Sequence, residues 1–308
     1  MTDDVGDPPG ADDRLRLIFT CCHPALPMAG RVALTLRTVG GLSVADVARS
    51  FLVPEATMAQ RLVRARRKIE HAGIPYRVPP PELLEERLEG VLAVLYLAFN
   101  AGYSDVERTH VADSAISVTQ SLVDLMPRES EARGLLALML FQHSRRVARI
   151  GAGGELLTLE EQDRSRWVGL DIQRGRRELA MAGGRGPYVV QALIAQCHAT
   201  ADSATATDWP RVIRLYDELI ELTPTPVVAL NRAIAVGLGE SPEMGLLLID
   251  ELADRLRDFH LLPAARADLL IRAGRRDEAI ASLDRAIEIA PTELERAQLE
   301  RRRKSAMP

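Results

Sequence analysis

The chain has 308 residues, of which 47% are hydrophobic, 27% are charged and only 4% are aromatic. This length corresponds to about two domains of ordinary size, and the dominance of Ala, Leu, Arg and Glu favours an all-α fold. No uncharged apolar run approaches the roughly 18 residues of a membrane span, and the acidic N-terminus is unlike a secretory signal. We therefore expect a cytoplasmic protein.

The formal net charge of −4 hides an uneven distribution of charged residues along the chain. Residues 1–81 carry 11 Lys and Arg against 8 Asp and Glu, whereas 82–308 carry 28 against 35. The excess of cations is concentrated in 12–73, which holds 10 basic and 5 acidic residues. A small basic module followed by a larger acidic one indicates a nucleic-acid-binding domain joined to a domain with another kind of partner.

The first expected helix contains the sequence RLRLIFTCCHP, residues 14–24, in which Pro24 ends the helix. Cys21 and Cys22 stand here beside His23, but adjacent cysteines are poorly placed to bond to each other. A zinc site would need further ligands, and the only other such pair, Cys197-His198, is far away in the sequence. The pattern favours buried cysteines at a helix end, with no metal and no cofactor; metal binding or redox sensing is the alternative.

The next two helices are predicted by periodicity and by a cap. Val32, Leu36 and Val39 lie at helical spacing before the pair Gly40-Gly41. Ser43 can then cap a short helix, with Asp46 three residues on reaching back in a capping box. Pro54 and Glu55 suit the first turn of a longer helix that runs to about His71 and ends at Gly73.

The longer helix separates an apolar face from a basic one. Met58, Leu62, Ala65 and Ile69 recur at intervals of four, three and four, and five cations fall within residues 61–68. A short helix, a turn and a basic helix predict a helix-turn-helix DNA-binding domain over 12–73. Residues at the start of the helix are expected to contact bases, and those further along to contact phosphates. The expected DNA-binding residues are Ser43, Thr57, Gln60, Arg61, Arg64, Arg67 and Lys68. A solvated basic face on an ordinary helical hairpin is the alternative.

The stretch ALTLRTVGGLSVADVARSFLVPEATMAQRLVRARRKI resembles region 4 of bacterial sigma factors of the extracytoplasmic-function (ECF) class. The positions that carry the resemblance are Leu42-Ser43, Val47-Ala48, Pro54-Glu55, Thr57, Arg61-Leu62 and 64–66. The resemblance implies that this domain reads the −35 promoter element and contacts core RNA polymerase. Over roughly residues 12–308 the chain is similar to the ECF subgroup with a C-terminal tetratricopeptide-like (TPR-like) extension.

Region 2, the N-terminal part with which this class binds the polymerase clamp and melts the −10 element, has no counterpart in the sequence. Residues 1–11 have the composition of a flexible linker. Two interpretations are open. Either the given sequence starts downstream of the native start, or the gene has lost region 2. In the second case the product would bind DNA or polymerase without opening promoters.

The stretch AGIPYRVPPP, residues 72–81, contains four prolines, so we place a Pro-rich linker at 74–81. In the remainder, 82–308, residues 211–224 align with 278–291 at an offset of 67, nearly twice the 34-residue tetratricopeptide period. Helical hairpins of this kind bury their apolar faces only by stacking, so we expect a TPR-like helical solenoid whose groove binds a protein or peptide.

Two features of this acidic part could be taken for catalytic sites, but a structural role is favoured for each. The cluster EEQDRSRW, residues 160–167, is interpreted as ion pairs on a helix surface around a buried Trp167. The histidines His110, His143, His198 and His260 have neither a nucleophile nor a ligand at suitable spacing, so each is expected to be structural.

The predicted function is that of a sigma-factor-like regulator of transcription initiation, not an enzyme. Its partners would be promoter DNA with a −35 element, core RNA polymerase and a segment bound in the TPR-like groove, with no membrane. The alternative is a TPR-type interaction scaffold whose basic hairpin binds nucleic acid without sequence preference. An enzyme that uses Cys21, Cys22 and His23 is a more distant hypothesis.

Overall fold

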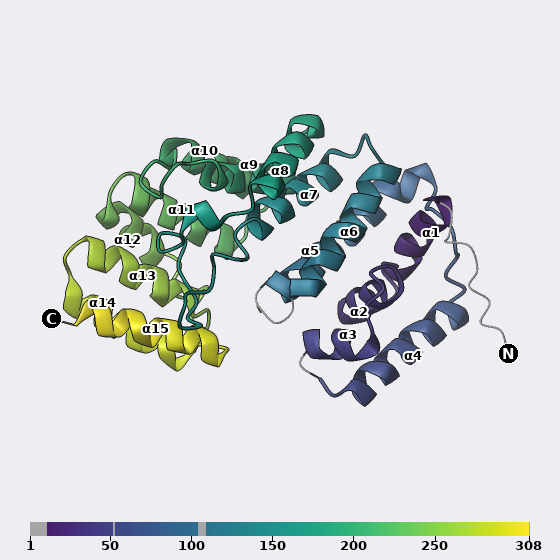
Figure 1. The fold of residues 1–308 in the computed structure, drawn as a ribbon, viewed down its shortest axis with the longest axis horizontal. Coiled ribbons are helices and arrows are strands. Elements are labelled where there is room, and N and C mark those ends of the chain that lie inside the picture. Colours follow the sequence, from purple (N-terminus) through teal and green to yellow (C-terminus); the bar gives the residue numbers. More distant parts are fainter. Residues whose placement is uncertain (1–10, 52, 104–108, 308) are drawn as a thin grey trace. The chain divides into compact units, whose positions relative to one another are not determined.

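The computed structural model describes residues 11–51, 53–103 and 109–307 (Figure 1). The linker predicted for 1–11 lies outside this range except for its last residue. The described residues are helical and contain no strand, only an isolated antiparallel bridge between Ile150 and Leu156. This confirms the all-α prediction. None of the helices in these ranges is long and apolar enough to cross a bilayer.

The chain divides into two compact units, which are described separately. Unit 1 comprises residues 1–143 and 177–184, and unit 2 comprises 144–176 and 185–308. The helices of unit 1 are α1 (Ala11–Cys21), α2 (Met28–Thr38), α3 (Val44–Ser50), α4 (Glu55–His71), α5 (Pro81–Tyr103), α6 (Thr109–Leu125) and α7 (Ser130–His143). Unit 1 also takes the C-terminal part of α8 (Gly169–Ala182).

Helices α1 to α4 enclose the first part of the unit 1 core. The side chains of Phe19, Leu36 and Met58 are almost completely buried, and they come from α1, α2 and α4. Helix α2 ends at a turn in which Gly41 has a φ of +72°, a conformation that L-residues rarely adopt. The amide of Leu42 then donates to the carbonyl of Leu36 (3.1 Å), which closes the helix end before α3 begins.

Helices α5 and α6 pack against α1 and α2 within unit 1. The Arg87 guanidinium of α5 donates to the carbonyl of Phe19 (2.8 Å), and the Ser114 hydroxyl of α6 donates to the carbonyl of Gly40 (3.3 Å). Residues on both sides of the Pro-rich segment 74–81 therefore share one compact unit. The domain boundaries placed at 12–73, 74–81 and 82–308 stay a prediction.

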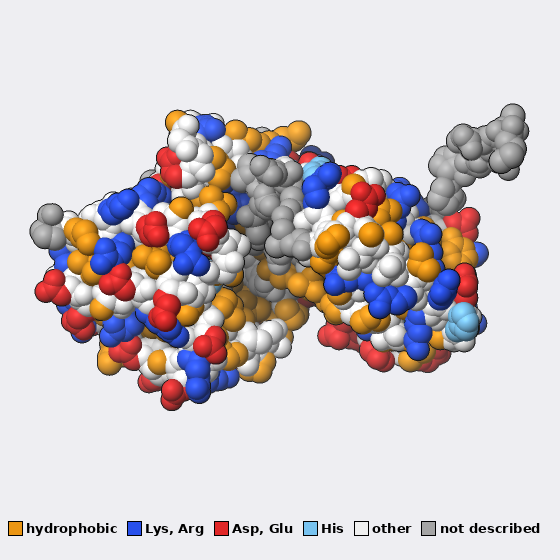
Figure 2. Space-filling view, turned by 90° about the horizontal axis from the view of Figure 1, so that it is seen from below, with side chains coloured by type: hydrophobic (Ala, Val, Ile, Leu, Met, Phe, Trp, Pro, Cys, Tyr) orange, Lys and Arg blue, Asp and Glu red, His pale blue; other side chains and the backbone are white. Residues whose placement is uncertain are grey.

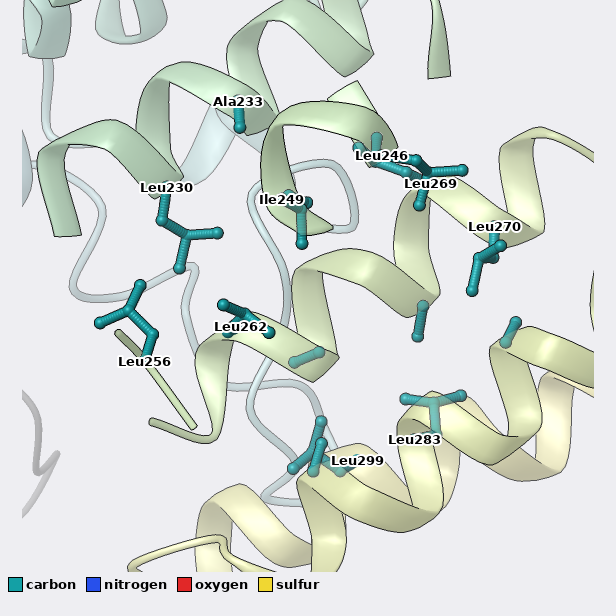
Figure 3. Close-up of a cluster of buried hydrophobic side chains, with 14 of the residues drawn as sticks. Leu230, Ala233, Leu246, Ile249, Leu256, Leu262, Leu269, Leu270, Leu283 and Leu299 are labelled. Carbon is teal, nitrogen blue, oxygen red and sulfur yellow. The ribbon is translucent and has the colours of Figure 1, made fainter. Parts of the chain in front are cut away.

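Unit 2 is a succession of helices in which each packs against the next along the chain (Figure 1). Its complete helices are α9 (Pro187–Ala199), α10 (Trp209–Leu222), α11 (Pro226–Gly239), α12 (Pro242–Asp250), α13 (Leu261–Arg272), α14 (Arg276–Glu288) and α15 (Glu293–Ala306). Figure 3 shows part of the core, with Leu230, Ile249 and Leu283 among the buried side chains that α11 to α15 contribute.

The segment 144–168 belongs to unit 2 and is held by side chains far away in the sequence. Arg301 of α15 donates to both carboxylate oxygens of Glu161 (2.8 and 3.1 Å) and to the carbonyl of Leu156 (3.1 Å). Arg272 of α13 pairs with Glu160 (2.5 Å). The interpretation of 160–167 was therefore right about ion pairs and about the buried Trp167, but wrong about a helix surface, because only the short 3-10 helix η2 (Arg164–Arg166) forms there.

Candidate nucleic-acid interface

The capping box predicted at the start of α3 is present. The Ser43 hydroxyl accepts from the amide of Asp46 (3.0 Å), and the Asp46 carboxylate accepts from the amide of Ser43 (3.2 Å). The Ser43 hydroxyl also donates to the same carboxylate (2.6 Å), and Arg49 pairs with it from the last turn. These bonds, chiefly those from Ser43, hold the pKa of Asp46 below its usual value. The box fixes where α3 begins.

Helix α4 is anchored by its apolar side. Met58, Leu62 and Ala65 are buried, and α4 packs against α2 and α3. Its N-terminal residue follows Pro54, whose φ of −57° is already close to the helical value. At the other end, Gly73 has a φ of +59°, and the amide of Ile74 donates to the carbonyl of Ile69 (3.0 Å). A short helix followed by an anchored longer one is the arrangement of a helix-turn-helix.

The predicted DNA-contacting residues of α4 share one side of the helix. At about 100° per residue, they fall within an arc of about 120° that does not overlap the buried positions. The residues in this arc, called the basic face below, are Thr57, Gln60, Arg61, Arg64, Arg67 and Lys68. Gln60, Arg64, Arg67 and Lys68 are exposed, whereas Thr57 and Arg61 are half-buried. Lys and Arg side chains gather over α4 on the surface of unit 1 in Figure 2.

The cations of α4 have no carboxylate partner within the described part of the chain. None of the five cations between 61 and 68 forms an ion pair there, and Nε of Arg64 donates to the carbonyl of Gln60 (3.4 Å). Unpaired cations on one helix face repel one another and attract a polyanion. The basic face is thus largely exposed, its cations are not neutralised by carboxylates, and it lies on a helix anchored by its opposite side. These are properties that binding to a DNA backbone requires.

Ser43 differs from the other predicted contact residues. Its hydroxyl and its amide are both engaged by Asp46, so its observed role is to fix the start of α3. A direct contact between Ser43 and DNA stays a prediction. The six residues of the basic face lie together on α4, and Ser43 lies at the end of the neighbouring helix.

The cysteines at the end of α1 are part of the core. The side chains of Cys21 and Cys22 are 2% and 1% exposed, and Sγ of Cys22 lies 3.4 Å from the hydroxyl of Thr35. Burial raises the pKa of Cys21 to about 12 and that of Cys22 to about 11, so both remain thiols at neutral pH. This environment favours the structural interpretation of the pair.

Sequence reasoning missed contacts that order this part of unit 1. His110 of α6 lies 3.6 Å from the Asp46 carboxylate, next to the capping box. Arg31 of α2 donates to the carbonyls of Leu26 (2.7 Å) and Pro24 (2.8 Å), which orders the turn after α1. The tie from His110 joins residues more than sixty positions apart, and no local pattern in the sequence marks it.

Comparison with known proteins agrees with this geometry. Residues 16–69 match the family Sigma-70, region 4, and residues 87–183 match a family of unknown function, DUF6596. Region 4 is a non-enzymatic domain that recognises promoter DNA and interacts with RNA polymerase, so this part of the chain is sigma-factor-like. An uncharacterized protein of Rhizobium meliloti (strain 1021), R00370, is 43% identical over 296 residues, which cover 94% of this chain and 70% of that protein. On this similarity the chain, with its sigma-70 region 4 segment, belongs to the same family as that protein.

Proposed function

We propose that the protein regulates transcription initiation by reading a −35-type promoter element through the basic face of α4 while bound to core RNA polymerase. It does so as a cytoplasmic member of the ECF class of sigma factors, without catalysing a reaction. The observation that carries the proposal is the set of unpaired cations on α4 within a segment that matches sigma-70 region 4.

The contacts are assigned by position on α4. Thr57, Gln60 and Arg61 lie in the first half of the helix, where a recognition helix meets base edges. Arg64 follows just past the middle of the helix, on the same face. Arg67 and Lys68 lie further along and contact phosphates. A bidentate Arg or Gln contact discriminates between bases by roughly 1–3 kcal/mol, whereas a phosphate contact adds affinity for any sequence.

For the test, the intact chain first selects its preferred sequence from a library of random duplexes. The affinities of three single variants for that selected duplex are then measured. Arg64→Ala should weaken binding to the selected duplex by about tenfold or more and leave binding to a scrambled duplex much less affected. Lys68→Ala should weaken both duplexes alike and reduce the dependence on salt concentration by about one counterion. Arg303→Ala is the matched control, because Arg303 pairs with Asp284 in unit 2 and should not affect DNA binding.

The same experiment separates the sigma-like function from the scaffold alternative. A scaffold with a nonspecific basic hairpin would yield no selected sequence, and Arg64→Ala and Lys68→Ala would then have equal effects on every duplex. It would also fail to co-purify with core RNA polymerase from the native host. Either result would contradict the proposed function.

For residues 82–308 we propose a TPR-like domain that regulates the sigma-like segment or binds a partner. The internal alignment of 211–224 with 278–291 equates α10 with α14, two helix pairs apart. Successive packing from α9 to α15, with an additional contact between α11 and α13, is the pattern of stacked helical hairpins. Deleting 185–308, which lie outside unit 1, and repeating the DNA selection would test whether this part of the domain changes promoter choice or affinity.

A further inference from the structure

Unit 2 contains a cavity between helices α11 and α13 and the segment 158–160. Its volume is about 390 Å³, within the roughly 300–1,000 Å³ range of sites that hold small molecules. Much of its wall is apolar, with Leu230 and Ile234 from α11, Ala264 and Ala265 from α13, and Phe259. Such a wall suits an apolar body of modest size.

The charged residues of the wall are already paired. Glu160 binds Arg272 (2.5 Å), and Asp268 binds Arg302 (3.0 Å). These pairs brace the wall and leave no free charge on it. The polar side chains of the wall that make no hydrogen bond with a described residue include Asn231 and His198. A ligand would therefore be recognised by hydrogen bonds at these two positions.

His198 connects the cavity to a layer of unsatisfied polar atoms. Buried side-chain atoms without a hydrogen-bond partner among the described residues include Gln162 Oε1, Arg164 Nη2, Trp167 Nε1 and His198 Nδ1. Three of these residues are neighbours, since Arg164 donates to the carbonyl of His198 (2.7 Å) and lies 4.4 Å from the ring centre of Trp167. Buried polar groups are normally bonded, so three unpartnered ones in contact favour a polar ligand group beside His198.

An arginine charge lies close to His198. Burial, followed by the charges of Arg145 and Arg164, lowers the pKa of His198 to about 4, so its imidazole is neutral at neutral pH. Arg164 forms no ion pair with a carboxylate in the described ranges, and its charge is balanced only by carbonyls at the end of α9, those of His198 and Ala201. The Arg164 guanidinium, which lies against the His198 carbonyl and has no carboxylate partner in these ranges, would attract an anionic group.

The geometry points to a small-molecule site in which this cavity holds a ligand with an apolar body and one carboxylate, the carboxylate lying at the His198 end. The site is distinct from the basic face of α4 and does not depend on the function proposed for it. The chemical class is a monocarboxylic acid small enough for a cavity of about 390 Å³. Its carboxylate would accept a hydrogen bond from His198 or from the Asn231 amide.

Tryptophan fluorescence can report binding, because both tryptophans of the chain are near this site. Trp209 lines the cavity with its ring 5.5 Å from that of His198, and Trp167 lies beneath Arg164. The intact chain would be titrated with benzoate, phenylacetate and octanoate at pH 7, with octan-1-ol as the uncharged counterpart of octanoate. Calorimetry would establish the stoichiometry. We expect one-to-one saturable binding of at least one acid, and octan-1-ol at least tenfold weaker than octanoate.

Three variants locate the site. Ala265→Phe, which fills the cavity, should abolish binding, and His198→Ala should weaken it about tenfold. His71→Ala, an exposed histidine of unit 1, is the control and should leave binding unchanged. Thermal unfolding of each variant shows whether it folds; if Ala265→Phe does not, Asn231→Leu replaces it. The proposal would be overturned if none of the three acids showed saturable binding, or if octanoate and octan-1-ol bound with equal affinity. It would also be overturned if binding survived both Ala265→Phe and His198→Ala.

Discussion

The contact between Glu161 and Arg301 permits a quantitative prediction. Two nitrogens of the Arg301 guanidinium donate to the Glu161 carboxylate. The amide and the hydroxyl of Thr158 also donate to Oε2 of Glu161, at 2.8 and 2.9 Å. Chiefly because of Arg301, the pKa of Glu161 falls from 4.5 to about 2. That difference corresponds to at most about 3 kcal/mol of stability at neutral pH. Because the Glu161 side chain is 38% exposed, solvent screening reduces the expected value to about 1–2 kcal/mol.

The perturbation is Glu161→Gln, followed by urea unfolding with tryptophan fluorescence as the signal. Trp167 and Trp209, the two tryptophans of the chain, belong to unit 2, so the signal reports the unit that contains the pair. We expect a loss of about 1–2 kcal/mol in the free energy of unfolding at pH 7. Glu288→Gln is the matched control: Glu288 also pairs with an arginine of unit 2, but it is 68% exposed and should cost less than about 0.5 kcal/mol.

The pH dependence provides the stricter test. A carboxylate whose folded pKa is depressed stabilises the fold above its unfolded pKa of 4.5, and the contribution disappears as the pH falls toward 2. The difference between wild type and Glu161→Gln should therefore be constant from pH 8 to about 5.5 and shrink steadily between pH 5 and 3. A variant as stable as wild type at pH 7, or a difference that stays constant down to pH 3, would refute the reasoning.

Four further predictions concern two glycines, the cap of α3 and the buried cysteines. Gly245→Ala should destabilise unit 2 by about 3 kcal/mol in urea unfolding, because the new Cβ would lie 2.6 Å from Cα of Gly237, a backbone atom that cannot move aside. Gly90→Ala on α5, whose Cβ would meet nothing nearer than 3.8 Å, should be neutral or stabilising by up to about 1 kcal/mol. Ser43→Ala should lower the stability of unit 1 by about 1 kcal/mol in thermal unfolding followed by circular dichroism, and Ser43→Thr, which keeps the hydroxyl, should retain most of it. Cys21 and Cys22 should resist a disulfide reagent at pH 8 in the native protein and react at once in urea; fast native labelling would contradict their burial.

The features predicted well from the sequence are those fixed within a few residues. Ser43 and Asp46 are three positions apart, so their mutual capping depends only on local backbone geometry. The separation of the buried Met58 from the exposed Gln60 and Arg64 follows from helical periodicity alone. The turn at Gly41 follows from a conformation that glycine adopts at little cost.

The features that the sequence did not predict depend on contacts between distant residues. Arg87 and Phe19 are 68 positions apart, and Arg301 and Glu161 are 140 apart, with no periodic relation to reveal either pair. The segment 160–167 is charged enough to look like the surface of an α-helix, yet it forms no α-helix, and Arg272 and Arg301 pair with its glutamates. Long-range pairing of charges thus overrides a composition that favours helix.

Two basic runs of the chain, 61–68 and 301–304, differ in their surroundings, and this difference explains why only the first is a candidate for binding DNA. In 301–304, Arg301 pairs with Glu161, Arg302 with Asp268 and Arg303 with Asp284, so three of the four cations are neutralised inside unit 2. In 61–68 the described residues supply no carboxylate to any of the five cations. A polyanion gains little from a cation that already has a partner, because binding would first require breaking that ion pair. A basic run therefore becomes a nucleic-acid surface only where the fold keeps carboxylates away from it, and α4 meets that condition whereas α15 does not.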